Sequence, residues 1–289
     1  MIVSLKKLKS GFSMPVFGFG TWRMGGNHTR NPLKNDHRQI TAIRQAIDHG
    51  ITHIDTAQMY AQGHAEELVG QAIKEFNRKK LFIVSKVWPD HLRFEDVLKS
   101  AALSLKRLKT DYLDLYLIHM PNPAIPISQT MKAFDKLKSD GFIKNIGVSN
   151  FSVRSFKAAQ KVTENKIVVN QVHYNLIYRE PEKSGLLEFC QKNDVLLVAW
   201  RPVEKGILAD YGISVLDGIS LKYKKSPAQI ALNWLISQKN VVTLAKMENK
   251  KHLLENLGAL KWQMEKNDIE KLRKGFPGQK IISDAVPLG

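Results

Sequence analysis

Apolar runs with the character of β-strands alternate along the chain with amphipathic runs that have the period of α-helices. The strand-like runs lie near residues 17–20, 53–55, 81–86, 113–119, 143–149, 167–174, 195–200 and 241–244. They recur roughly every 30 residues and are too uniformly apolar to have one face in water, which is typical of parallel strands covered by helices. The pattern therefore predicts eight strand-helix units.

Two architectures could accommodate these units. A closed (β/α)8 barrel of the TIM type fits best, because such barrels form one domain at about 250 residues and this chain has 289. An open sheet that binds a dinucleotide would need G-x-G-x-x-G after the first strand, and the run from Gly18 to Arg23 lacks the last glycine. We expect a single α/β barrel domain over residues 1–289.

Two segments stand outside the regular repeat. Residues 2–8 and 13–16 are expected to pair as an N-terminal β-hairpin, within residues 1–16, that closes one end of the barrel. Residues 201–221 form a connection far longer than usual between a strand and a helix. We expect a long loop over the mouth of the barrel there, with a short extra helix as the alternative.

Local signals mark where three helices begin. Asp36 with Gln39 resembles a capping box, and Ser226 followed by Pro227 is typical of a cap with a proline in the first turn. Asn249 precedes another amphipathic run.

The composition is that of a folded globular protein, with 43% hydrophobic and 25% charged residues. The one cysteine, Cys190, lies in an apolar pattern, so we expect it in the core, and a lone cysteine suits a reducing compartment. No apolar run reaches the roughly 18 residues needed to cross a membrane, and the first residues lack the apolar region of a signal peptide. We expect a cytoplasmic protein without a membrane partner.

The chain is strongly basic, with 44 basic and 27 acidic side chains and a net charge of +17. The lysines are spread along the whole sequence and no nucleic-acid motif accompanies them. We therefore expect a solvated basic surface that also attracts an anionic cofactor, and no nucleic-acid partner.

Polar side chains lie at the carboxyl ends of three successive predicted strands. Asp55 ends the second strand with Tyr60 in the loop behind it, Lys86 ends the third, and His119 ends the fourth. Each alone has an ordinary explanation as a solvated lysine or a hydrogen-bonded polar residue. In a closed barrel, however, the carboxyl ends of the strands share one mouth, so all four would face one hollow.

The four residue types make chemical sense together. An ammonium at Lys86 would lower the pKa of Tyr60 from its ordinary value of about 10, and Asp55 would compensate that charge. His119 could orient a substrate oxygen. Such a site can protonate a carbonyl oxygen but contains no reductant, so a hydride source must be bound.

Several motifs closely resemble those of the aldo-keto reductase family, nearly from end to end of the chain. They are residues 50–60 (GITHIDTAQMY), 117–120 (LIHM), 146–151 (IGVSNF) and 170–174 (NQVHY). The resemblance implies a (β/α)8 barrel with an N-terminal hairpin that reduces aldehydes and ketones with NADPH. It also implies that Tyr60 is the proton donor and that Asp55, Lys86 and His119 are its catalytic partners.

The resemblance also implies a cofactor site, and no metal. Ser149, Asn150 and Gln171 would hold the nicotinamide carboxamide, and Trp200 would stack on the ring where many members have tyrosine. The full implied set is Gly20, Thr21, Trp22, Asp55, Ser149, Asn150, Gln171, Trp200, Lys246, His252, Glu255 and Asn256.

The adenosine end departs from the family pattern, because His252 stands where NADP-specific members often have arginine. Lys246, with Lys250 or Lys251, could still bind a 2′-phosphate. We therefore predict NADP(H) in preference to NAD(H).

The implied substrate side is mostly apolar. It comprises Trp22, Met59, Trp88, His119 and Met120. Met120 stands where tryptophan is common in the family, so no steroid, sugar or aromatic preference is carried over, and we expect a small or flexible carbonyl compound. The expected protein is a monomeric aldehyde reductase.

Two other functions stay open on the sequence. Lys86 could form a Schiff base in a barrel lyase, because such lysines also lie at strand ends. The chain could also be a regulatory subunit that binds the cofactor without turnover. The sequence does not identify the physiological substrate or the preferred direction.

Overall fold

A computed structural model describes residues 3–289, and within them eight parallel strands close into a barrel. The strands are β3 (Phe17–Gly20), β4 (His53–Asp55), β5 (Phe82–Val87), β6 (Leu115–Ile118), β7 (Ile146–Ser149), β8 (Ile167–His173), β9 (Leu196–Trp200) and β10 (Val241–Ala245). Each pairs with its neighbour in sequence, and β10 pairs with β3 through Thr243 opposite Phe17, which closes the ring. The predicted (β/α)8 barrel is confirmed, and the open sheet is excluded.

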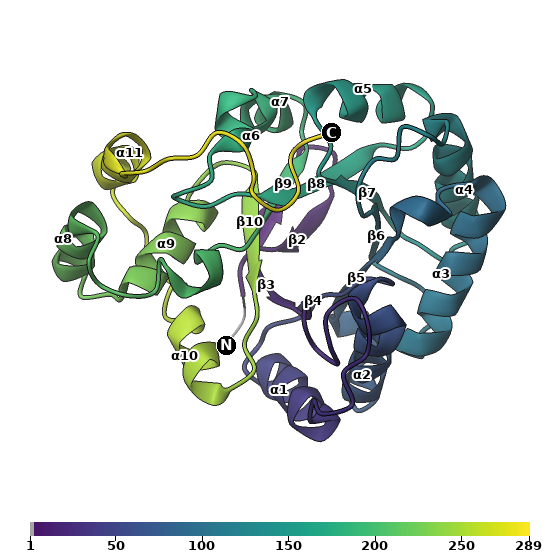
Figure 1. The fold of residues 1–289 in the computed structure, drawn as a ribbon, viewed down its shortest axis with the longest axis horizontal. Coiled ribbons are helices and arrows are strands. Elements are labelled where there is room, and N and C mark those ends of the chain that lie inside the picture. The colour runs from purple at the N-terminus through teal and green to yellow at the C-terminus, as the bar shows by residue number, and fades with distance from the viewer. Residues whose placement is uncertain (1–2) are drawn as a thin grey trace.

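Helices surround the barrel (Figure 1). They are α1 (Asp36–Asp48), α2 (His64–Ile73), α3 (Phe94–Leu108), α4 (Ile127–Ser139), α5 (Val153–Lys161), α6 (Glu180–Lys183), α7 (Leu186–Lys192), α8 (Ser214–Tyr223), α9 (Pro227–Ile236), α10 (Lys250–Leu257) and α11 (Lys266–Gly275), with short 3-10 turns η1 (Tyr60–Gly63), η2 (Arg78–Lys80), η3 (Pro89–His91) and η4 (Glu204–Gly206). In the described part of the chain, none of these helices combines the length and apolarity that a membrane crossing requires.

Successive side chains of each strand point alternately to the inside of the barrel and to the surrounding helices. Both sides are buried, which explains the continuous apolar character of the strands. In β4, Ile54 belongs to the large outer core beneath the helices. His53 and Asp55, its neighbours in the strand, are also buried and point to the opposite, inner side. Cys190 of α7 is buried as expected, and burial raises the pKa of its thiol to about 12.

The N-terminal hairpin consists of β1 (Leu5–Lys7) and β2 (Ser13–Pro15), paired antiparallel. Phe12 beside it packs edge-to-face on Phe82 at the start of β5, with the ring centroids 6.2 Å apart. The hairpin therefore covers the amino-terminal end of the barrel, opposite the mouth, as predicted. Residues 1 and 2 of the expected hairpin lie outside the described residues.

Two of the three predicted helix starts agree with the structure. The Ser226 hydroxyl and the Gln229 side chain form a full capping box for α9, and the Asn249 side chain accepts from the His252 amide in α10. The first prediction was wrong by one residue, because Asn35 caps α1 and Asp36 is already helical. Both side chains are suited to the cap position, so the local signal did not separate them.

The predicted long loop over residues 201–221 was partly wrong. It contains η4 and then the start of α8 at Ser214, so the extra helix that was the alternative is present. Figure 1 also shows the last segment of the chain, in yellow, running from α11 to a point near α5. There the Gly289 amide donates to the Asn150 carbonyl at 3.0 Å, so this segment reaches the end of β7.

Candidate active site

A buried ion pair joins the ends of β4 and β5. The Lys86 ammonium donates to Asp55 Oδ1 at 2.6 Å and to the Thr56 carbonyl at 2.9 Å, and the Lys86 and Asp55 side chains are 0% and 3% exposed. Burial disfavours the ammonium, but the charge of Asp55 and the phenol of Tyr60 outweigh it and raise the pKa of Lys86. Lys86 therefore stays charged at neutral pH.

Tyr60 lies against this ion pair at the start of η1. Lys86 Nζ donates to the phenolic oxygen at 3.4 Å, which leaves the hydroxyl proton available to another acceptor. Burial raises the pKa of Tyr60, and this effect exceeds the opposing effect of the Lys86 charge. The expectation that Lys86 brings the pKa of Tyr60 below its ordinary value was therefore wrong for the protein alone: Tyr60 carries its proton at neutral pH.

His119 follows β6 and is half-buried beside Tyr60, with ring centroids 5.7 Å apart in an edge-to-face arrangement. Burial, followed by the charges of Lys86 and His28, lowers the pKa of His119 well below its ordinary value. The imidazole is therefore neutral at neutral pH. Its one N–H can donate to a substrate oxygen.

Five aromatic rings form a closed series of contacts, which we call the aromatic circuit. The rings belong to Tyr60, Trp22, His28, Trp88 and His119, and the successive centroid distances are 4.9, 5.4, 6.4, 5.6 and 5.7 Å back to Tyr60. The circuit includes both tryptophans expected on the substrate side. It also includes His28, which the sequence reasoning missed because no spacing or motif marks it.

The two methionines expected on the substrate side lie outside the circuit. Met59 is half-buried and packs against the small apolar cluster that contains Tyr60. Met120 directly follows His119 and is also half-buried.

The amide side chains expected to hold a nicotinamide connect the parts of this site. Asn150 Nδ2 donates to the His119 carbonyl at 3.0 Å, and Trp200 Nε1 donates to Asn150 Oδ1 at 3.3 Å. Gln171 Nε2 donates to Asp55 Oδ2 at 2.9 Å. Asn150, directly after β7, has a positive φ of 62°, a left-handed backbone conformation that asparagine tolerates.

Ser149, Gly20 and Thr21 surround the same strand ends. The Ser149 hydroxyl donates to the Gln171 carbonyl at 2.8 Å, and Thr21 Oγ1 donates to the Asp55 carbonyl at 3.0 Å. A Cβ at Gly20 would come within 2.8 Å of the tip of the Leu244 side chain, so the glycine leaves room for that leucine.

The four residues expected at the adenosine end lie around α10, and they divide into two pairs. Lys246 and His252 are exposed near the helix start, where backbone amides and lysines favour an anion. Glu255 and Asn256 face the protein instead: the Glu255 carboxylate accepts a hydrogen bond from the hydroxyl of Ser226, which caps α9, and Asn256 is buried. In the structure, this second pair contributes to the packing of α10 against the rest of the protein.

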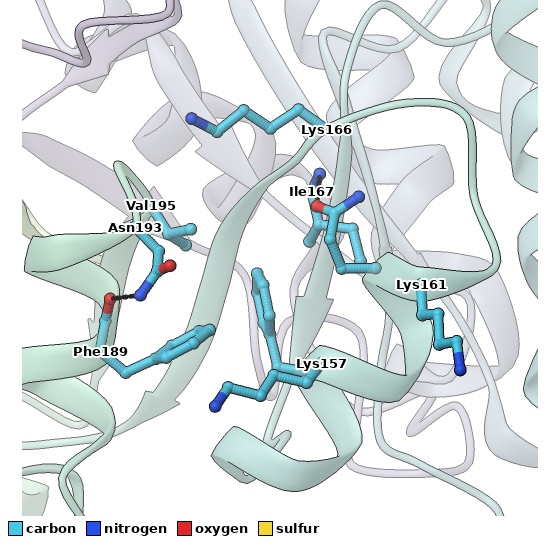
Figure 2. Close-up of a pocket in the computed structure, with 9 residues that line it drawn as sticks. Lys157, Lys161, Lys166, Ile167, Phe189, Asn193 and Val195 are labelled. Carbon is cyan, nitrogen blue, oxygen red and sulfur yellow. Dashed lines mark hydrogen bonds between the residues drawn. The ribbon is translucent and has the colours of Figure 1, made fainter.

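A surface hollow of about 340 Å³ lies elsewhere, between α5 and α7 (Figure 2). Its lining includes Lys157, Lys161 and Phe189, together with Ile167, the first residue of β8. It therefore lies by the amino-terminal ends of the strands, away from Tyr60. The hollow has no part in the arrangement around the ion pair.

Known proteins of similar sequence identify the family of this chain. Residues 16–275 match the Aldo/keto reductase family. The chain is 37% identical to the glyoxal reductase of Bacillus subtilis over 277 residues, which is 94% of each protein. This chain belongs to the aldo-keto reductase family, and it is an oxidoreductase that acts on carbonyl groups.

Two solved structures resemble the protein over almost their whole length. The thermostable aldo-keto reductase Tm1743, solved in complex with the inhibitor epalrestat, is 44% identical with a TM-score of 0.90, over 94% of this chain and 99% of that chain. An aldo-keto reductase from Klebsiella pneumoniae in complex with NADPH is 32% identical with a TM-score of 0.85, over 97% and 98% of the two chains.

Proposed function

We propose that the protein reduces a small aldehyde or ketone to the alcohol with NADPH, and that Tyr60 is the proton donor. The observation that carries the proposal is the contact of a protonated phenol with a buried ion pair. Lys86 Nζ lies 2.6 Å from Asp55 and 3.4 Å from Tyr60. Two other strand ends bring amide donors to the same place.

The residues present fit a nicotinamide dinucleotide. Trp200 is half-buried and offers a flat ring, and Ser149, Asn150 and Gln171 are polar groups gathered beside it. The solved relative from Klebsiella pneumoniae contains NADPH. Lys246 directly follows β10 and is exposed, with Glu248 3.2 Å from its ammonium, and it offers a cationic group for a 2′-phosphate. When bound, the cofactor supplies the hydride that the protein itself lacks.

The side chains of the protein supply the proton, stabilise the charge and orient the substrate. Tyr60 gives its hydroxyl proton to the carbonyl oxygen as negative charge develops there, so the oxygen becomes the alcohol hydroxyl and Tyr60 becomes a phenolate. Lys86 stabilises that phenolate, and Asp55 keeps Lys86 charged. Neutral His119 donates a hydrogen bond to the same substrate oxygen and orients it.

A small substrate is favoured by the aromatic circuit, which surrounds Tyr60 with indole and imidazole rings. The relative from Bacillus subtilis is named for glyoxal, the smallest dialdehyde. We propose small aldehydes, including 2-oxoaldehydes, as the substrates to test first.

A Schiff-base lyase fits the geometry less well. Schiff-base formation needs a neutral amine, whereas the salt bridge to Asp55 raises the pKa of Lys86 despite its burial. Borohydride trapping with a carbonyl substrate would label Lys86 only if that alternative were right.

The experiment is a screen of small carbonyl compounds followed by the loss of reduced-nicotinamide absorbance. We expect turnover with glyoxal or methylglyoxal, and a lower KM for NADPH than for NADH. A preference for NADH would overturn the assignment of Lys246. Tight NADPH binding without turnover of any carbonyl compound would replace the proposal with the regulatory alternative.

A further inference from the structure

His28 is held between the two tryptophans of the aromatic circuit. Its ring meets Trp22 at 5.4 Å and Trp88 at 6.4 Å, edge-to-face in both cases, with interplanar angles of 74° and 70°. The next rings beyond these indoles are Tyr60 and His119, the two groups proposed to contact the reacting oxygen. The His28 side chain is exposed, so it lies on the open side of the circuit.

The backbone fixes the loop that carries His28. The carbonyl of Asn27 accepts from the amide of Ala61 at 2.7 Å, and Ala61 is the residue directly after Tyr60. The loop turns sharply at Gly26, which has a φ of 145° and where an added Cβ would come within 2.1 Å of the Thr29 carbonyl oxygen. The position of His28 relative to Tyr60 is therefore set by main-chain geometry.

Two rings of the circuit, those of His28 and Trp22, have ring N–H groups that no hydrogen bond among residues 3–289 engages, and His28 is the more exposed of the two. Under the proposed function, Tyr60 and His119 both serve the reacting oxygen, and the indole N–H of Trp88 donates to Asp90 at 3.2 Å. The ring of His28 meets its neighbours by aromatic contacts, and no hydrogen bond among residues 3–289 engages its nitrogens. The charge of His28 also contributes to lowering the pKa of His119, after burial and Lys86, so the two imidazoles are close enough to interact.

We propose that His28 is a specificity-determining residue that hydrogen-bonds a second oxygen, on the carbon next to the reacting carbonyl, and so selects vicinal dicarbonyl compounds over simple aldehydes. This inference rests on the proposed function. In a vicinal dicarbonyl the two oxygens are about 3 Å apart, so a substrate held by Tyr60 and His119 presents its second oxygen to the neighbouring wall. A pocket wall without hydrogen-bond donors would leave this second oxygen unpaired, whereas the imidazole of His28 can donate to it.

The test compares two matched aldehydes, methylglyoxal and propanal, which differ only in that methylglyoxal has a carbonyl group where propanal has a methylene group. In His28→Phe, which keeps a ring but has no donor, we expect kcat/KM for methylglyoxal to fall about tenfold, with propanal changed by less than about twofold. His28→Gln retains a donor and should keep most of the preference. An equal loss for both aldehydes, or no loss for either, would overturn the proposal.

A binding measurement separates this proposal from the proposed function. Methyl pyruvate has the vicinal oxygen and butanone lacks it, and quenching of tryptophan fluorescence in the NADP⁺-loaded protein reports their affinities without turnover. We expect methyl pyruvate to bind about tenfold tighter in the natural protein and the difference to vanish in His28→Phe. If this binding difference is found but no carbonyl compound is reduced, the proposed reductase function is refuted and the role of His28 is not. If carbonyl compounds are reduced but methyl pyruvate and butanone bind equally well to the natural protein, the role of His28 is refuted and the reductase function is not.

Discussion

The indole of Trp200 lies flat on the imidazole of His173, with the ring centroids 4.3 Å apart and 10° between the planes. The other face of His173 stacks on Tyr178 at 4.2 Å. Trp200 is thus supported from behind by two further rings. Under the proposed function, its opposite face is the one that meets the nicotinamide.

His173 is itself fixed by two hydrogen bonds. Its Nε2 lies 2.7 Å from Glu204 Oε2, and its Nδ1 lies 2.8 Å from the Ser283 hydroxyl. The Ser283 oxygen accepts from the amides of Ala285 and Val286, so its own proton is free to go to Nδ1. These two contacts hold the imidazole ring of His173 in a fixed position behind Trp200.

We predict that His173→Leu weakens NADPH binding by about fivefold, because loss of an aromatic stacking partner costs on the order of 1 kcal/mol and frees Trp200 to tilt. His173→Phe, which keeps a stacked ring, should bind NADPH within about twofold of the natural protein. Fluorescence titration of the two variants measures this. Equal losses in both would assign the effect to the hydrogen bonds of His173 instead.

Removal of the buried ammonium should affect stability as well as activity. We expect Lys86→Met to lower the free energy of unfolding by about 3–5 kcal/mol, because Asp55 is then left buried without its counter-charge. Lys136 pairs with Asp140 on the surface of α4 and is 52% exposed, so Lys136→Met should cost less than about 1 kcal/mol. Denaturant unfolding compares the two variants.

The double variant Lys86→Met with Asp55→Asn separates charge from packing. It should recover much of the stability, since no unpaired charge remains, but it should stay inactive. A double variant as unstable as Lys86→Met would show that packing around the lysine chain, and not the charge of Asp55, causes the loss.

His53 makes stability depend on pH. It is fully buried, and burial lowers its pKa from 6.5 to about 4, with Asp55 opposing and Lys86 adding to the shift. Between these two values the unfolded chain binds a proton that the folded chain does not, so stability falls as the pH drops from 6.5 toward 4. The full loss corresponds to about 3 kcal/mol.

Chemical unfolding at several pH values in this window tests the assignment. His53→Gln should flatten the dependence, whereas the same change at His37, which is exposed, should leave it as it is in the natural protein. If the slope survives in His53→Gln, another group is responsible.

The shifts of Tyr60 and His119 predict a broad pH profile for kcat/KM. Burial raises the pKa of Tyr60 above 10 and lowers the pKa of His119 well below 6.5, so both keep the required protonation state between these values. We expect a plateau between pH 6.5 and 10, with the rate falling on either side. A rate that declines through pH 7 to 8 would mean that Tyr60 or His119 titrates there, against both assignments.

The fold could be predicted because the eight apolar runs and their spacing allow few arrangements. The meeting of Asp55, Lys86 and Tyr60 followed from that topology, since strand ends meet at one mouth. The contacts of His28 and His173 could not be predicted in this way. They depend on the sharp turn at Gly26 and on ring contacts between segments far apart in the chain.

The error over the pKa of Tyr60 has a similar origin. The sequence indicates that a cation lies near the phenol, but it does not measure the burial that opposes the charge. Here desolvation outweighs Lys86, which places the proton on Tyr60 in the protein alone. The residue types predict a proton-donor site, but they do not give the direction of the pKa shift of Tyr60.

The proton-donor assignment is tested most directly by the steady-state rate of NADPH oxidation by Tyr60→Phe with methylglyoxal, at saturating cofactor. Removal of the transferable proton should lower kcat/KM by about 10²–10⁴-fold while the dissociation constant of NADPH stays nearly unchanged. A Tyr60→Phe variant that reduces methylglyoxal at the rate of the natural protein would contradict the assignment.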